Sequence, residues 1–495
     1  MPPARQTLRR TTATGVLWLL FQGVSGRLAS FGSQLVLAKL LLPAAFGQIG
    51  LAYTVTTLIT AVIGFGIDDV LVTRLRHLRL WVAPAFWSSL SLALAGMGVM
   101  LAAAPVAAYL YGAPQLTGLI AVLALNVPLG ALSMVPTVRL RADLNFRYLG
   151  AYATAEMLAI QLATVLCAAA GLGAYSFVLP VPVAAAIKAV VFWRRAPVRL
   201  RPGHRRRQYR HILGSGVLMF VTRLITAAVN QVPTMVLGVL ATQTVVGVYF
   251  FAFRLAVQPL QMLAGSFGNV LFPAFAQLQA EPARQMAAAL RASRILAYTV
   301  TPVCFLQAAV AAPLLHLMFG TRWDGSIGLM QILSLGLPGD AVSWVAGAVL
   351  VARGAFRRDL VLTASFTPPI VICAVAGAWL DGAQGTALGV AVFYALIKPV
   401  SSWLVFRQAM SAGDVVRLYA TPTLLAGCAI GAAAALAGLP ALTAHPVAQI
   451  ALTGALGPLL YLVALRVGAV GVLREIANQL PLGRLGRLRG MIGSI

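Results

Sequence analysis

The chain of 495 residues is 60% hydrophobic and only 10% charged, with a mean hydropathy of +0.89. A water-soluble globular protein could not cover so large an apolar fraction, so the composition excludes that class and indicates an integral membrane protein. The formal net charge of +26 would suit a nucleic-acid-binding protein. However, the basic residues fall in alternate loops between apolar runs, and we therefore predict no nucleic-acid partner.

Apolar runs of about twenty residues recur along the chain, and each is long enough to cross roughly 30 Å of hydrocarbon as a helix. A strand barrel would need alternating polarity, which these runs lack. The sequence therefore predicts an all-α integral membrane protein of about fourteen transmembrane helices. The predicted helices cover residues 15–40, 45–67, 82–111, 116–136, 150–172, 174–193, 212–240, 246–274, 295–319, 325–352, 360–380, 384–406, 419–438 and 447–467.

Loop charges predict the orientation of these helices. Thirty of the 37 basic residues fall in loops on the same side as the N-terminus, whereas the opposite loops contain only Lys39 and Arg322. The positive-inside rule then places both termini in the cytoplasm, and the alternation supports an even number of helices. The N-terminal arginines precede no small-residue cleavage site, so we interpret this end as mature sequence.

Short sequence similarities recur at a spacing of about 200 residues. The segment GVLWLLF from Gly15 resembles GVLMFVT from Gly216, and FGQIGLAY from Phe46 resembles VGVYFFAF from Val246. Six helices separate the two starts, so the repeats are predicted to be parallel and to form two six-helix lobes around a substrate site. The predicted parts are an N-lobe at 1–193, a basic cytoplasmic linker at 194–211, a C-lobe at 212–406, two extra helices at 407–468 and a basic interfacial tail at 469–495.

Basic residues within predicted helices are the sharpest functional signal. A charged residue at the centre of a span costs roughly 3 kcal/mol on insertion scales, so such residues normally face protein or a wet cavity. Arg27 and Arg223 lie too deep for their side chains to reach the membrane surface easily. Lys188 and Lys398 lie nearer to helix ends, and a structural role for them is the alternative. The five residues are Arg27, Lys188, Arg223, Arg254 and Lys398.

Few acidic residues are available to neutralise these cations. Glu156 and Asp340 lie within predicted helices, and Asp68 and Asp69 lie at the end of the second helix. Either of the first two could pair with one guanidinium, yet some arginine would still lack a carboxylate. Such a surplus of guanidinium groups suits a phosphate or diphosphate, which they can bind with two hydrogen bonds each.

Asp340 follows Pro338 and Gly339, a dipeptide that predicts a break in the tenth helix. The sequence is compatible with two roles for Asp340: ion coupling or gating at the break, or an aspartate whose hydrogen bonds are satisfied locally at a kink. Further candidates for ion coupling are Glu156, Asp68 and Asp69. The four cysteines stand apart in apolar runs and are interpreted as buried apolar residues. No metal site, cofactor motif or catalytic motif is found, and we predict no enzyme.

Three runs carry a resemblance to a known family: LVLAKLLLPAAFGQIGLAY, YFFAFRLAVQPLQMLAGSFGNVLFPAFAQLQ and LLHLMFGTRWDGSIGLMQILSLG. They resemble polysaccharide flippases of the multidrug/oligosaccharidyl-lipid/polysaccharide exporter superfamily, in the Wzx-like subgroup that exports exopolysaccharide or O-antigen units. The resemblance implies a multi-pass protein of the bacterial inner membrane that flips an undecaprenyl-diphosphate-linked oligosaccharide by alternating access. It also implies contact with membrane lipids and association with polysaccharide polymerase or export machinery.

Lipid II flippases of the same superfamily carry essential arginines in a central cationic cavity, on the first and eighth helices among others. Arg27 and Arg254 match that placement by helix and depth, whereas Arg223 has no assigned counterpart. A multidrug exporter of the same superfamily is the nearest alternative, but it would need acidic residues facing the cavity. A membrane polymerase or glycosyltransferase would need catalytic carboxylates in a large outer loop, and the outer loops are short.

Overall fold

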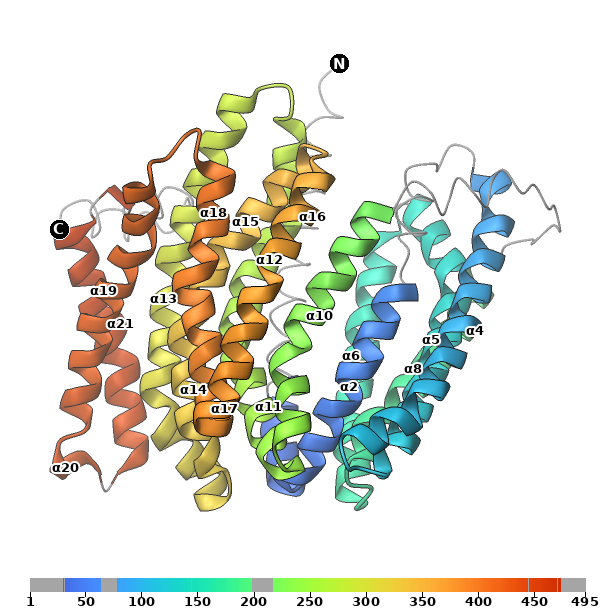
Figure 1. The fold of residues 1–495 in the computed structure, drawn as a ribbon, viewed down its shortest axis with the longest axis horizontal. Coiled ribbons are helices and arrows are strands. Elements are labelled where there is room, and N and C mark those ends of the chain that lie inside the picture. The colour runs from blue at the N-terminus through green and yellow to red at the C-terminus, as the bar shows by residue number, and fades with distance from the viewer. Residues whose placement is uncertain are drawn as a thin grey trace. The chain divides into compact units, whose positions relative to one another are not determined.

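The computed structural model describes residues 30, 32–63, 78–143, 145–197, 217–443, 445–469 and 471–472. All regular elements within these ranges are helices (Figure 1), which confirms the predicted all-α fold. Eleven helices of the described ranges are long and apolar enough to span a membrane. The first predicted helix lies mostly outside these ranges, so the total of fourteen stays a prediction.

The described chain divides into two compact units. The first contains the described residues up to Leu255 together with Phe356–Gly389. Its helices are α2 (Pro43–Ile63), α4 (Leu78–Leu110), α5 (Gln115–Ala142), α6 (Phe146–Ala169), α7 (Tyr175–Val178), α8 (Pro180–Arg195), α10 (Val217–Leu240), α11 (Gln243–Ala256), α16 (Phe356–Ser365) and most of α17 (Thr367–Val392).

The second unit contains Ala256–Ala355 and the described residues from Val390 onward. Its helices are α12 (Gln258–Gln277), α13 (Pro282–Phe319), the 3₁₀ helix η2 (Gly320–Trp323), α14 (Asp324–Gly336), α15 (Pro338–Ala352), the π-helix η3 (Phe393–Ile397), α18 (Lys398–Phe406), α19 (Ala412–Ala437), α20 (Pro440–Thr443) and α21 (Pro446–Gly468). This division follows contacts within the chain, and the sequence-based lobes at 1–193 and 212–406 stay a prediction.

Apolar packing joins α4, α5 and α8, which lie side by side in the first unit (Figure 1). Phe86 of α4 is buried against Val135 and Val138 of α5, and Trp193 of α8 packs on the same cluster. The Trp193 indole also donates a hydrogen bond to the Leu132 carbonyl at 2.8 Å. Side-chain packing and hydrogen bonds between helices are the interactions that hold helices together in a membrane.

Several predicted helices are interrupted in the structure, and two of these interruptions lie near predicted site residues. The run predicted at 246–274 is split into α11 and α12 at Val257, where Pro259 occupies the first turn of the following helix. The run at 325–352 is split into α14 and α15 at Leu337, directly before Pro338, as the Pro-Gly dipeptide predicted. Proline removes one backbone donor and crowds the preceding turn, which explains both breaks.

Two glycines at equivalent places in the sequence repeats bring α2 and α11 into close contact. A Cβ on Gly47 would lie 1.9 Å from the Gln243 carbonyl oxygen, and a Cβ on Gly247 would lie 1.8 Å from the Pro43 carbonyl oxygen. Both glycines and both carbonyl residues are 200 positions apart. The contact is therefore reciprocal, as in a two-fold symmetric interface, and it supports the predicted internal repeat.

Candidate functional site

Arg254 lies in the last turn of α11, just before the break at Val257. The Arg254 side chain is partly buried. Val257 itself keeps helical backbone angles, φ −78° and ψ −13°, so Arg254 lies one turn before a local interruption within a single apolar span.

Neutral groups surround the Arg254 guanidinium. Gln34, in the helical segment 32–40, is only 2% exposed. With its amide oxygen turned toward the guanidinium, Gln34 accepts from Nε at 2.6 Å and from Nη2 at 3.2 Å. The rings of Phe177 and Phe250 lie 6.0 and 5.8 Å from the guanidinium carbon, within the range of cation–π attraction. These contacts hold the arginine in place and leave its charge intact.

No ion pair among the described residues involves Arg254. An arginine cannot lose its charge by giving up a proton, so the site is positive around this residue. Within the described part of the chain, Gln34 accepts from Nε and Nη2, and the donors on Nη1 can serve another acceptor. The arrangement is suited to an anion, and phosphate oxygens match the planar donors of a guanidinium.

Glu156 and Lys188 form an ion pair between α6 and α8. The Lys188 Nζ lies 2.9 Å from the Glu156 Oε2, and the two side chains are 31% and 17% exposed. Lys188 also lies over the Phe192 ring at 5.9 Å. Glu156 therefore neutralises a lysine, and the alternative in which it pairs with an arginine is not seen here.

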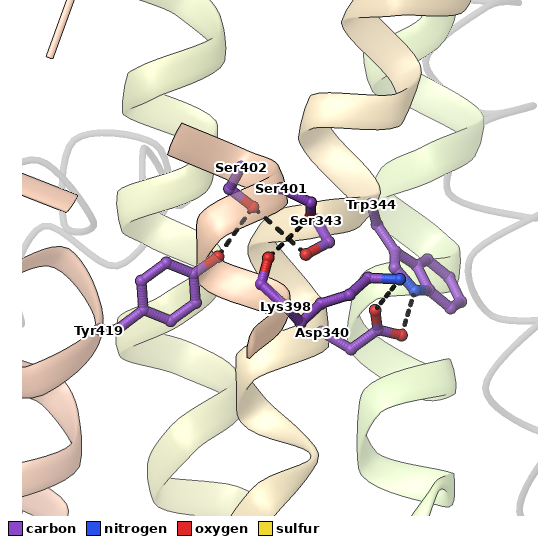
Figure 2. A network of polar contacts seen from close by, with 7 residues as sticks. All are labelled: Asp340, Ser343, Trp344, Lys398, Ser401, Ser402 and Tyr419. Carbon is purple, nitrogen blue, oxygen red and sulfur yellow. Dashed lines mark hydrogen bonds and ion pairs between the residues drawn. The ribbon is translucent and has the colours of Figure 1, made fainter. Parts of the chain in front are cut away.

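Asp340 and Lys398 form a second pair, between α15 and α18 (Figure 2). The Lys398 Nζ lies 3.6 Å from the Asp340 Oδ1, and the Trp344 indole donates to Oδ2 at 2.9 Å. Beside the pair, Tyr419 of α19 donates to the Ser402 hydroxyl at 2.9 Å, and Ser402 lies 3.2 Å from the Ser343 hydroxyl. A polar network thus joins three helices of the second unit.

Irregular backbone borders this second pair on both sides. The π-helix η3 ends directly before Lys398, and the break between α14 and α15 comes three residues before Asp340. A Cβ on Gly339 would lie 1.9 Å from the Tyr394 carbonyl oxygen, so only glycine lets α15 lie this close to the π-helix. Single π-helical turns occur frequently at functional sites, which makes the Asp340–Lys398 pair the second candidate site.

Comparisons with known proteins give the family. Residues 36–328 match the model of the family described as "Polysaccharide biosynthesis protein". This chain belongs to the polysaccharide biosynthesis protein family. The resemblance to polysaccharide flippases of the multidrug/oligosaccharidyl-lipid/polysaccharide exporter superfamily is thereby confirmed. The match covers α2 to the beginning of α14, and so it includes Arg254, Glu156 and Lys188.

Two relatives of this polysaccharide biosynthesis protein align over most of its length. The succinoglycan biosynthesis transport protein ExoT of Rhizobium meliloti (strain 1021) is 25% identical over 414 residues, which cover 80% of this chain and 81% of ExoT. The lipopolysaccharide biosynthesis protein WzxC of Escherichia coli (strain K12) is 24% identical over 440 residues, which cover 86% of this chain and 88% of WzxC. Neither name denotes an enzyme, in agreement with the prediction of a non-catalytic protein.

Solved structures of similar fold come from the same superfamily. The lipid II flippase MurJ, in an inward closed conformation, matches with a TM-score of 0.66 at 12% identity, over 91% of this chain and 100% of MurJ. A point mutant of the Vibrio cholerae MATE transporter VcmN matches with a TM-score of 0.56 at 15% identity, over 84% and 99% of the two chains. At these identities the likeness shows the fold of this family member and no more.

The structure describes only some of the predicted site residues of the family member. Arg27, Asp68 and Asp69 lie outside the described residues. Arg223 lies in α10 with an exposed side chain that makes contacts of its own, and the contacts of Arg254 described above do not include it. Arg254, Lys188 and Lys398 are the predicted basic residues whose surroundings the structure defines.

Sequence reasoning missed the residues that position these charges. Gln34 is a single amide in an apolar run, and its only signal is that a buried amide in a membrane helix needs a partner. Trp344 lies four residues after Asp340, which places both side chains on the same face of the helix. This spacing is a sequence signal for the hydrogen bond from the Trp344 indole to Asp340. Ser402 and Tyr419 carry no such signal, because their contact joins helices α18 and α19.

Metal-ligand clusters are not found among the described side chains of His, Cys, Asp and Glu. All four cysteines are free. Cys304 is fully buried as predicted, but Cys428 is exposed, and its predicted burial is wrong. Cys428 lies on the apolar helix α19, where an apolar side chain can face lipid instead of the protein interior.

Proposed function

We propose that this protein flips an undecaprenyl-diphosphate-linked oligosaccharide from the cytoplasmic to the periplasmic leaflet of the bacterial inner membrane. Its relatives are named for the transport or biosynthesis of succinoglycan and lipopolysaccharide, and its fold resembles that of a lipid II flippase. In this proposal the protein moves the unit across the membrane, and separate polymerase and export proteins then use it. Both termini lie in the cytoplasm, following the loop charges.

Arg254 carries the proposal. A diphosphate between lipid and sugar keeps its negative charge at neutral pH, so it needs a cationic site that internal carboxylates have not neutralised. Arg254 has an amide and two aromatic rings as neighbours, and no ion pair of the described residues includes it. We infer that Arg254 binds the diphosphate, together with Arg27 and Arg223 as further cations of the cavity.

The two lysine–carboxylate pairs are proposed to serve the conformational cycle. Each pair is neutral as long as the carboxylate is ionised, so protonation or cation binding at Asp340 or Glu156 would weaken its contact with the lysine. The Asp340 pair lies beside a helix break and a π-helix, where the backbone has fewer regular hydrogen bonds to lose. We place ion coupling or gating at this pair first, with Glu156 second and Asp68 and Asp69 as further candidates.

A multidrug exporter is the rival proposal, since MATE transporters share the fold. A site for cationic drugs requires carboxylates that are not already neutralised. Here Glu156 and Asp340 each pair with a lysine, and Arg254 adds a positive charge. The electrostatics therefore support an anionic substrate.

Export in a bacterial strain that lacks its own flippase tests the proposal. We would compare the unchanged protein, Arg254→Gln, Arg254→Lys and the exposed-surface control Arg284→Gln at equal membrane abundance. We expect Arg254→Gln to lose most export and Arg254→Lys to keep part of it, because lysine keeps the charge without the planar fork. Export by Arg254→Gln equal to that of the control would overturn the assignment of this residue.

A further inference from the structure

An open groove lies between α13, α19 and the described residues that follow α21 in the second unit. It encloses about 1000 Å³ of empty space, including the part open to solvent. Two exposed arginines line it, Arg294 of α13 and Arg417 of α19, together with Tyr298 and Thr421. Leu418 and other apolar side chains complete the lining. The groove thus combines phosphate-binding donors with an apolar wall.

Helix lengths place this groove at the edge of the hydrocarbon layer. About twenty helical residues cross the layer, and α13 has 38 residues, so it extends well beyond it on one side. Counting about twenty residues back from its end at Phe319 reaches the neighbourhood of Tyr298. The same count back from Ala437, the last residue of α19, reaches Arg417. The arginines therefore lie at the depth of lipid headgroups.

The groove has an excess of positive charge. Asp414 is the one carboxylate among its lining residues, against the two arginines. Asp414 already accepts hydrogen bonds from the Ser411 hydroxyl at 2.7 Å and from the Ser411 backbone N–H at 3.1 Å, in the capping box that begins α19. Asp414 stays ionised and attracts Arg417, so the charged lining residues carry a formal excess of one positive charge.

We propose that this groove binds the phosphate of an anionic glycerophospholipid. The guanidinium groups of Arg294 and Arg417 suit a phosphodiester, and the apolar wall suits the first part of the acyl chains. The depth favours a lipid over a soluble phosphate, because soluble anions do not concentrate at this level of a bilayer. The cytoplasmic leaflet is assigned from the proposed orientation, and the site itself does not depend on the substrate of transport.

Lipid binding by the purified full-length protein in neutral detergent tests this site. Native mass spectrometry would count bound phosphatidylglycerol, and thermal unfolding would measure stabilisation, with phosphatidylcholine and inorganic phosphate as separate additions. The test variant is Arg294→Gln with Arg417→Gln. The matched control is Arg284→Gln with Arg357→Gln, which removes the same charge from exposed arginines outside the groove.

We expect phosphatidylglycerol to bind and stabilise both the unchanged protein and the control, with an affinity roughly tenfold or more above that of the groove variant. The proposal would be overturned if the groove variant bound phosphatidylglycerol as tightly as the unchanged protein does. It would also be overturned if the unchanged protein bound phosphatidylcholine as tightly as phosphatidylglycerol, or if inorganic phosphate stabilised it as much as phosphatidylglycerol does. If the double variant does not give monodisperse protein, Arg417→Gln alone is judged by the same criteria. Because no transport is measured, this result is independent of the export experiment on Arg254.

Discussion

Arg254 and Gln34 form one unit at the scale of single residues. The amide fixes two guanidinium nitrogens without adding charge, and the two phenyl rings limit how far the side chain can turn. The sequence could predict Arg254, because a deep arginine is costly and therefore conspicuous. It could not predict Gln34 as its partner, because that contact joins residues 220 positions apart.

Replacing Gln34 by Glu tests whether the neutrality of this partner matters. A carboxylate at the same place would pair with the guanidinium and neutralise it, so we expect export to fall at least tenfold in Gln34→Glu. Gln34→Ala removes the support but leaves the charge, and we expect a smaller loss. Both are measured in the flippase-deficient strain at equal protein abundance. Equal losses in the two variants would show that the amide matters for packing alone.

The lysine pairs answer a question that the sequence left open. Glu156 and Asp340 could have paired with arginines, but each lies beside a lysine in its own unit. Pairing depends on which helices become neighbours, and loop charges and periodicity do not determine that. The helix break before Asp340 was predictable, since Pro338 and Gly339 are local signals.

A double-mutant cycle on Asp340 and Lys398 tests their coupling. Lys398→Ala alone leaves a mostly buried carboxylate without its cation, and we expect a loss of about 1 to 3 kcal/mol of stability. Asp340→Ala with Lys398→Ala removes both charges and should recover part of that loss. Thermal unfolding of the unchanged protein, the two single variants and the double variant gives the interaction energy between the two residues. Strictly additive losses would show that the 3.6 Å contact contributes nothing.

At the scale of helices, the contact between α2 and α11 connects the sequence repeat with the packing. Gly47 and Gly247 are equivalent in the predicted repeat, and each lies against a backbone carbonyl at the start of the other helix. The loop charges predict that this contact lies on the periplasmic side. Two-lobed carriers close one side while the other is open, and so we expect this contact to hold the outer side closed.

Alanine at either glycine tests that contact. In Gly47→Ala the new methyl group would collide with the Gln243 carbonyl, and we expect a loss of about 1 to 3 kcal/mol in stability together with reduced export. Gly98→Ala in α4 is the matched control, since a Cβ there meets no atom within 4 Å. Its stability should be unchanged or slightly raised, as alanine favours the helix. Equal melting temperatures for Gly47→Ala and Gly98→Ala would contradict the close contact.

At the scale of the whole molecule, composition and the length of the apolar runs predicted the membrane class and the all-α fold, and the structure confirms both. Helix ends and breaks were less predictable. The helix predicted to begin at 295 begins at Pro282, because basic residues such as Arg284 and Arg291 hide a helix that extends beyond the apolar run. Hydropathy marks the part of a helix that lies in lipid, and α13 is longer than that part.

Reporter fusions test the predicted orientation. We expect alkaline phosphatase to be active when fused at Gly112, between α4 and α5, because that loop is predicted to be periplasmic. Green fluorescent protein fused at Asn145 or at the C-terminus should fluoresce, since both sites are predicted to be cytoplasmic. Phosphatase activity at the C-terminus would contradict the orientation and the even number of helices.

Movement of the lipid between leaflets is the most direct test of the central claim. Proteoliposomes would contain the purified protein and an undecaprenyl-diphosphate-linked oligosaccharide with a fluorescent sugar, and an added quencher that cannot cross the membrane would report the leaflet. We predict that the unchanged protein and Arg284→Gln equilibrate the probe between leaflets, whereas Arg254→Gln leaves it in place. Equal equilibration by Arg254→Gln, or none by the unchanged protein, would contradict a flippase that holds its diphosphate at Arg254.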